Sequence, residues 1–163
     1  QLEDGGWAIA GDTADSDMTG MALQSLAKYY LHEGETAVYA VDVNPAVDAA
    51  LDLLSQMQFD DGSYGTFDGS GNIVPTSESI SQVVTALCAL GIDPETDERF
   101  IKNGCSAIDA LMDYYVEGGG FRHLLDHDRD GMATEQAYYA LVAYDRLLSG
   151  KTRLYDMTDV LNP

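Results

Sequence analysis

Residues 58–64, QFDDGSY, decide the fold, because the same pattern occurs three times at one spacing. The other copies are QLEDGGW at residues 1–7 and YVEGGGF at residues 115–121. Each copy is a Gly-rich turn that ends in an aromatic residue, and about 57 positions separate one aromatic from the next. A unit repeated at this period predicts helical hairpins that bury their apolar faces against their neighbours.

Apolar residues at helical spacing place the helices between these turns. Five helices are expected, at residues 17–32, 46–58, 78–90, 103–116 and 132–149. Asp17 is the expected N-cap of the first helix, and Thr76 or Ser77 opens the third. Pro45 suits the first turn of the second helix. The chain is therefore predicted to be all-α and a single domain over residues 1–163, with repeats at about 1–32, 45–91 and 103–150.

The helices that follow the turns also repeat. Residues 19–26, 80–87 and 134–141 align with one another. Small residues occupy the same position in all three, namely Ser25, Ala86 and Ala140. Small side chains let helices approach closely, so these three helices are expected to form one tightly packed layer.

Composition narrows the classes of partner. The chain has 163 residues, 45% of them hydrophobic, and 28 acidic side chains against 8 of Lys and Arg, for a net charge of −20. Such a surface disfavours nucleic acids and anionic membranes, which bind positive charge. No run reaches the roughly 18 apolar residues of a membrane span, and nothing at the N-terminus resembles a signal peptide. Cys88 and Cys105 are expected to be buried free thiols.

The three turns and their register resemble the terpenoid cyclase and protein prenyltransferase family, whose squalene-cyclase members carry Gln-x3-Gly-x-Trp repeats. Residues 1–7 match that signature fully, residues 58–64 have Tyr for Trp, and residues 115–121 lack the Gln. The resemblance implies an α/α toroid, of which this chain would supply about three helical hairpins of an α6/α6 ring. We therefore expect the C-terminal half of a larger ring, which pairs with an N-terminal half or forms a dimer.

The resemblance also bears on function. The chain is most similar to prenyltransferase-like repeats in surface proteins of Gram-positive bacteria, and more distantly to the helical domain of transcobalamin. These similarities imply an extracellular or cell-surface location. The first hypothesis is a non-catalytic module that binds a ligand or a protein or glycan partner at a concave acidic end. That end would be formed by Asp15, Asp17, Asp126, Asp128, Asp130 and Glu135. A corrinoid-binding domain is an alternative.

Two aspartates carry the enzyme alternative. Residues 15–20, DSDMTG, are similar to the D-x-D-D-T-A acid motif of cyclases that protonate a polyene. Asp17 would then be the acid and Asp15 its partner, because such an acid needs a neighbour that holds its proton. Met18 replaces the third aspartate of the motif. The competing interpretation is structural: Asp17 caps the helix and Asp15 favours its dipole.

Residues 126–131, DHDRDG, read as the first half of a calcium loop. Asp126, Asp128 and Asp130 are the candidate ligands, and Glu135 is the nearest later carboxylate. Oxygen ligands at this spacing suit calcium. Position 12 of the loop, however, holds Ala137 rather than the usual Glu, and an acidic cap of the last helix is the alternative. Calcium is thus the one cofactor that the sequence indicates.

Five further side chains are candidates for contact with a ligand. Trp7, Tyr64 and Phe121 end the turns and either line a cavity or wedge between hairpins. Gln82 and Gln136 are expected to face the bore of the ring, and Asp17 is expected to contact a ligand from the acidic end. The glutamines that open the first two turns are expected to tie each turn to the preceding helix. The stretch 68–72 is expected to be a flexible turn without metal.

Overall fold

The computed structural model of this protein describes residues 1–32, 34, 35 and 41–161. These residues are mainly helical and contain six α-helices and one short 3-10 helix. In chain order the helices are α1 Ser16–Leu26, α2 Asn44–Met57, α3 Ser77–Ala89, η1 Glu98–Phe100, α4 Ala107–Met112, α5 Gly131–Leu148 and α6 Thr158–Leu161. The predicted helices are all present, although several of their ends differ.

Two short hairpins correct the all-α prediction. β1 Gly65–Phe67 pairs antiparallel with β2 Ile73–Pro75, and β3 Phe121–Arg122 pairs with β4 Arg129–Asp130. Each hairpin lies between a signature turn and the next helix, where the chain must reverse direction and pair its backbone groups. The stretch 68–72 is the tip of the first hairpin, and the Asp68 carboxylate accepts from the Asn72 amide there at 2.8 Å.

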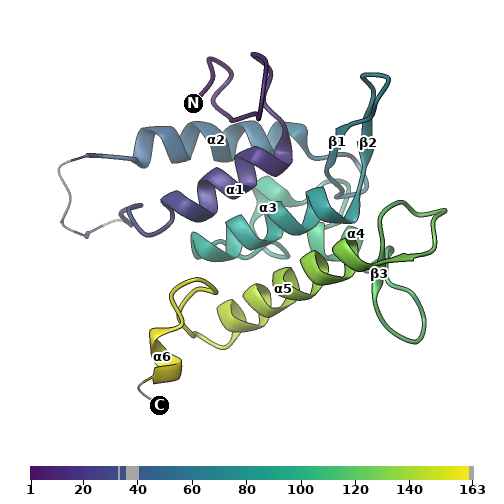
Figure 1. Cartoon of the computed structure of the whole chain (residues 1–163). Helices are drawn as coiled ribbons and strands as arrows, with labels where there is room; N and C mark the ends of the chain where they lie inside the picture. The colour runs from purple at the N-terminus through teal and green to yellow at the C-terminus, as the bar shows by residue number, and fades with distance from the viewer. Residues whose placement is uncertain (33, 36–40, 162–163) are drawn as a thin grey trace.

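Helices α1, α3 and α5 form one layer, which we call the inner layer. α3 lies in its centre and packs against both α1 and α5, while α2 covers α1 and α4 covers α3. The three inner helices run in the same direction in Figure 1, with their N-terminal ends beside the hairpins. Because α3 has neighbours on several sides, every residue from Ser77 to Cys88 is buried.

The inner helices begin with equivalent caps. Asp15, Thr76 and Asp130 are extended residues whose side chains accept from a backbone amide three positions later. Each cap lies four residues before the aligned stretches predicted from the sequence. The predicted cap Asp17 is wrong, because the Asp15 side chain accepts from the Met18 amide at 2.7 Å and Asp17 lies inside the first turn.

Two predicted helices are too long. The first ends at Leu26 rather than residue 32, and the Asn44 side chain binds both backbone groups of Leu31, at 3.0 Å and 2.7 Å. The fourth begins at Ala107 rather than residue 103, because Asn103 and Gly104 have positive φ angles of 49° and 84°. A capping box between Ser106 and Asp109 then starts α4.

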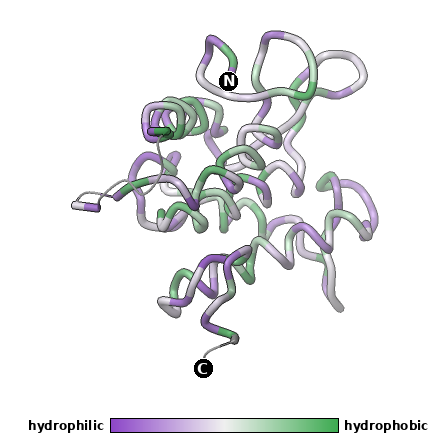
Figure 2. The backbone as a smooth tube through the Cα atoms, turned by 60° about the vertical axis from the view of Figure 1, so that its left-hand side comes forward, coloured by the Kyte–Doolittle hydropathy of each residue, from purple (hydrophilic) through white to green (hydrophobic). Residues whose placement is uncertain are grey.

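Close contact between α1 and α3 depends on a glycine. A Cβ atom at Gly20 would lie 2.9 Å from the Gln82 carbonyl oxygen, so only glycine allows this approach. Cys88 is a buried free thiol as predicted, whereas Cys105 is partly exposed. Hydrophilic residues interrupt the helices along the chain (Figure 2), and no helix among the described residues is long and apolar enough to cross a membrane.

Candidate functional site

The signature glutamines bind the turns to the helices that follow. The Gln58 side-chain amide donates to the Gly62 carbonyl at 3.0 Å and to the Phe100 carbonyl at 2.9 Å. Gln1 makes the equivalent bonds to Gly5 and to Ala46 in α2. Only the backbone amide of Gln58 bonds to α2, at the Leu54 carbonyl, so the predicted tie from the glutamine side chains to the preceding helix is wrong. The second bond links each turn forward along the chain, which was not predicted.

The signature aromatics pack inside the protein. Tyr64 and Phe121 are fully buried, and Trp7 packs half-buried against the same core. The Thr134 hydroxyl accepts from the Phe121 amide at 2.9 Å, and Thr19 makes the equivalent bond to Trp7 at 3.0 Å. Trp7 and Phe121 are therefore bonded to the first turn of α1 and α5, and all three aromatics pack against the core.

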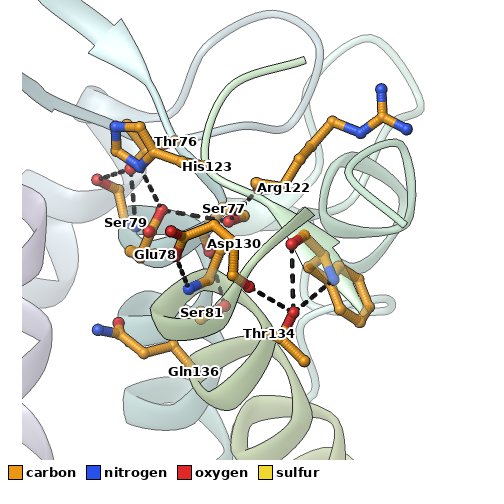
Figure 3. Close-up of polar contacts among 12 residues, drawn as sticks. Thr76, Ser77, Glu78, Ser79, Ser81, Arg122, His123, Asp130, Thr134 and Gln136 are labelled. Carbon is orange, nitrogen blue, oxygen red and sulfur yellow. Dashed lines mark hydrogen bonds and ion pairs between the residues drawn. The ribbon is translucent and has the colours of Figure 1, made fainter. Parts of the chain in front are cut away.

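A cavity of about 700 Å³ lies at the acidic end of the inner layer, where α3 and α5 begin beside the loop between β3 and β4. Four carboxylates and three potential cations line it, namely Glu78, Asp126, Asp128, Asp130, His123, His127 and Arg129. The His123 Nδ1 atom lies 2.9 Å from the Glu78 carboxylate, which joins the loop between β3 and β4 to the start of α3 (Figure 3). The three aspartates of the predicted calcium loop therefore face one space, and Glu135 is not among its lining residues.

Asp130 already has a structural role in this cavity. Its carboxylate accepts from the Ala133 amide at 2.9 Å, and backbone amides at the start of α5, that of Ala133 first, lower its pKa. No group of three or more His, Cys, Asp or Glu side chains in the described ranges is placed to hold a metal ion. Calcium binding by this loop stays a prediction.

Asp17 lies half-buried where the N-terminal ends of α1 and α3 meet. Burial raises its pKa, and the charges of Asp15 and Glu78 act in the same direction, while a hydrogen bond from the Ser79 hydroxyl opposes them. One carboxylate oxygen of Asp15, the proposed partner of Asp17, accepts from the Met18 amide as the cap of α1.

Replacing Asp17 with asparagine is expected to raise the melting temperature at neutral pH and to change it little in acid. Because the pKa of Asp17 lies above its usual 3.8 in the folded state, the folded chain binds this proton more tightly than the unfolded chain does. The contribution of Asp17 to the free energy of unfolding is therefore lost as the pH rises from its pKa in the unfolded chain through its raised pKa in the folded chain. Circular dichroism melts across this pH range measure the difference, and equal melting temperatures at every pH would contradict a strained carboxylate.

A second cavity, of about 640 Å³, lies against the inner layer, and we call it the inner-layer cavity. All three inner helices line it, together with Lys28 just after α1 and the segment before α6. The lining residues are Met21, Gln24, Ser25, Lys28, Gln82, Tyr139, Arg153, Tyr155 and Asp156. Of the residues predicted to contact a ligand, Gln82 lines this cavity. The Gln136 side-chain oxygen accepts a hydrogen bond from Gln82.

Hydrogen bonds join four side chains across the inner layer, and we call this set the amide chain. The Gln24 side-chain amide donates to the Gln82 side-chain oxygen at 2.9 Å and to the Gln82 carbonyl at 3.1 Å. Gln82 in turn donates to the Gln136 side-chain oxygen at 2.9 Å and to the Tyr139 hydroxyl. Burial raises the pKa of Tyr139, so its hydroxyl stays protonated and neutral.

A buried arginine positions the remaining wall of the cavity. The Arg146 guanidinium donates to the Thr152 carbonyl at 2.7 Å and to the Asp159 carboxylate at 2.5 Å. These bonds turn the chain back after α5, so that Arg153 and Tyr155 reach the cavity. The side chain of Arg146 is only 8% exposed, so its ion pair with Asp159 is largely shielded from solvent.

Sequence reasoning missed most of this wall, although one signal was available. In the aligned stretches Gln24 and Tyr139 occupy the same position, one in α1 and one in α5. Two polar residues at one position of a buried layer indicate a polar face. The contribution of Arg153 and Tyr155 had no comparable signal, because it depends on the contact between Arg146 and the segment that follows α5.

The comparisons with known proteins do not assign a family. No model of a known protein family matches this chain, and no curated protein matches its sequence.

Proposed function

We propose that this chain is a non-catalytic binding module that holds its ligand in the inner-layer cavity. The main support is the amide chain that crosses α1, α3 and α5 at the cavity wall. Gln82 is 8% exposed, and its side chain is bonded to three others, those of Gln24, Gln136 and Tyr139, which fixes its orientation. Small-molecule sites usually combine a cavity of this size with a few oriented polar groups.

Unused bonding capacity in the amide chain also supports the proposal. Within the described part of the chain, the Gln24 side-chain oxygen and the Gln136 side-chain nitrogen form no hydrogen bond. Each amide can accept at its oxygen and donate twice at its nitrogen. Of these two side chains Gln24 lines the cavity, so a ligand there would meet its free oxygen as an acceptor without breaking the bonds that hold Gln82.

The setting of the module is proposed from resemblance alone. The signature turns favour an α/α toroid in which the inner layer faces the bore, and the similarity to bacterial surface repeats favours an extracellular location. Both remain proposals, because fold analogy does not establish function. A net charge of −20 is consistent with a well-solvated exterior.

Asp17 keeps a second candidate function open, that of a cyclase-like enzyme. The observation in its favour is the raised pKa of the half-buried Asp17, since such chemistry needs a carboxylic acid that holds its proton more tightly than usual. Turnover of an isoprenoid substrate that disappears in Asp17→Asn, while the fold persists, would establish the enzyme instead of the binding module.

The binding proposal is tested by NMR titration of the amide signals with calcium chloride, cyanocobalamin, farnesyl diphosphate and a set of neutral sugars. A ligand of the cavity is expected to shift the side-chain amide signals of Gln24, Gln82 and Gln136. Gln82→Leu keeps the volume but removes the bonds, so binding should be lost. Gln56→Leu on the exposed side of α2 is the matched control and should bind normally.

Two results would contradict this site. Shifts confined to residues 126–130 would place binding at the acidic end, and a calcium response there would support the predicted calcium loop. Binding that is unchanged in Gln82→Leu would show that the amide chain does not contact the ligand. A ligand at about a hundred times its dissociation constant should also add about 2.7 kcal/mol to the stability, which a thermal melt detects.

A further inference from the structure

We propose that the ligand of the inner-layer cavity is a carbohydrate, held by its hydroxyls on the amide chain and by its ring face on Tyr155. This inference rests on the proposed function, because it names the ligand class of the same cavity. It follows from the polarity of the wall, the distribution of charge and the exposure of one aromatic ring.

The wall offers neutral hydrogen-bond acceptors that the amide chain leaves available. These are the side-chain oxygen of Gln24 and the hydroxyl oxygens of Ser25 and Tyr139. A sugar hydroxyl can donate a hydrogen bond to each of these oxygens. An isoprenoid chain has no such donor, so it would use none of the polar groups of the wall.

The charge of the wall differs from that of the rest of the chain. Two of the chain's 8 basic side chains, Lys28 and Arg153, line the cavity, against a single carboxylate, Asp156. Arg153 lies 3.7 Å from that carboxylate, and Arg153 and Lys28 both contribute to lowering the pKa of Asp156, after a hydrogen bond from Thr158. The wall therefore carries one more positive than negative charge, and its two cationic side chains can donate hydrogen bonds to the oxygens of a sugar.

An exposed tyrosine provides an apolar surface beside the polar groups. Tyr155 is 67% exposed, and its phenol lies near enough to Tyr139 to contribute to the raised pKa of Tyr139, after burial. Across the cavity, Met21 is 47% exposed. The C–H face of a sugar ring can cover such a ring while its hydroxyls reach the amides, and tyrosine offers this amphipathic contact at a low entropic cost.

The contact with Tyr155 is held in place before a ligand arrives. The two bonds from Arg146 to Thr152 and Asp159 fix the segment on both sides of Tyr155. A site fixed in advance pays less ordering entropy on binding. The ring of Tyr155 is thus a positioned stacking surface rather than part of a loose end of the chain.

The test uses glucose, galactose, mannose and N-acetylglucosamine, each as the free sugar and as the terminal unit of a short oligosaccharide. At least one is expected to shift the side-chain amide signals of Gln24, Gln82 and Gln136. Tyr155→Ala should weaken its binding about tenfold, whereas Tyr155→Phe should retain it, because the ring remains. Gln82→Leu should abolish binding and Gln56→Leu should not change it.

The two sets of probes separate the sources of the sugar. Binding of the free sugars indicates a small-molecule ligand, and binding of the oligosaccharides alone indicates the end of a glycan; either supports the inference. Sugar shifts that map away from the cavity, or equal binding by Tyr155→Ala, would overturn it. If no sugar perturbs the cavity but cyanocobalamin or farnesyl diphosphate does, the carbohydrate inference fails and the binding function stands. If nothing perturbs the cavity, both fail.

Discussion

Replacing Gly62 with alanine should destabilise the chain by about 3–5 kcal/mol, the sum of a strained backbone and an overpacked contact. Gly62 has a φ angle of 85°, a region that residues with a side chain rarely adopt. A Cβ atom there would also lie 2.4 Å from the Ser106 carbonyl oxygen. Ser106 caps α4 through its capping box, so its backbone cannot move away without unwinding that helix. Urea unfolding measures the loss.

Gly71→Ala is the matched control for this substitution. Gly71 has nearly the same φ angle, 86°, but no atom lies within 4 Å of the position of its Cβ. It should therefore lose only the backbone part, about 1 kcal/mol. Equal losses in the two variants would mean that the close approach to Ser106 contributes nothing, and that Gly62 is needed for its backbone conformation alone.

The signature is thus explained by two separate physical requirements. All three signature glycines, Gly5, Gly62 and Gly119, have positive φ angles, so the turn itself requires glycine. Close packing is needed only at the first two, because no atom lies near the Cβ position of Gly119. The first two turns are also the ones that keep the glutamine. A repeated pattern in the sequence therefore predicted three similar turns, and the contacts that each makes differ.

Local patterns predicted the helices well and their ends less well. Periodicity placed α2, α3 and α5 within about two residues, since a buried face repeats over several turns. The start of α4 depends on the positive φ of Asn103, and the chain after α1 is held by side-chain bonds from Asn44 to Leu31; no periodic pattern records either feature. The two hairpins are only two or three residues per strand, too short for alternation to be recognised.

The residues of the candidate site could also be predicted only in part from the sequence. Gln82 and Gln136 were predicted because they align with one another in the repeated helices, and they are bonded to each other in the structure. The cavity wall contributed by Arg153 and Tyr155 could not be predicted, because it follows from the long-range bonds of Arg146. Buried polar side chains that reach across several helices are visible only after the chain has folded.

Two substitutions of Tyr64 should have opposite effects on the free energy of unfolding. Tyr64→Ala should cost about 3–5 kcal/mol, because it removes a fully buried aromatic side chain from the core. Tyr64→Phe should cost nothing and can gain about 1 kcal/mol, because the buried Tyr64 hydroxyl has no hydrogen-bond partner among the described residues. Burial also raises the pKa of Tyr64, so the hydroxyl brings no charge to offset this cost.

The equivalent position in the third copy is already phenylalanine, Phe121, which is buried to the same degree. Tyr64→Phe is therefore an exchange that the repeat tolerates elsewhere in the same chain. Urea unfolding of both variants against the parent gives the two free energies. A loss of more than about 1 kcal/mol in Tyr64→Phe would contradict an unpaired hydroxyl and would point to an ordered water that bonds it. A loss of unfolding free energy well below the expected range in Tyr64→Ala would contradict the packing role of the Tyr64 ring, because a side chain that holds two hairpins together should be costly to remove.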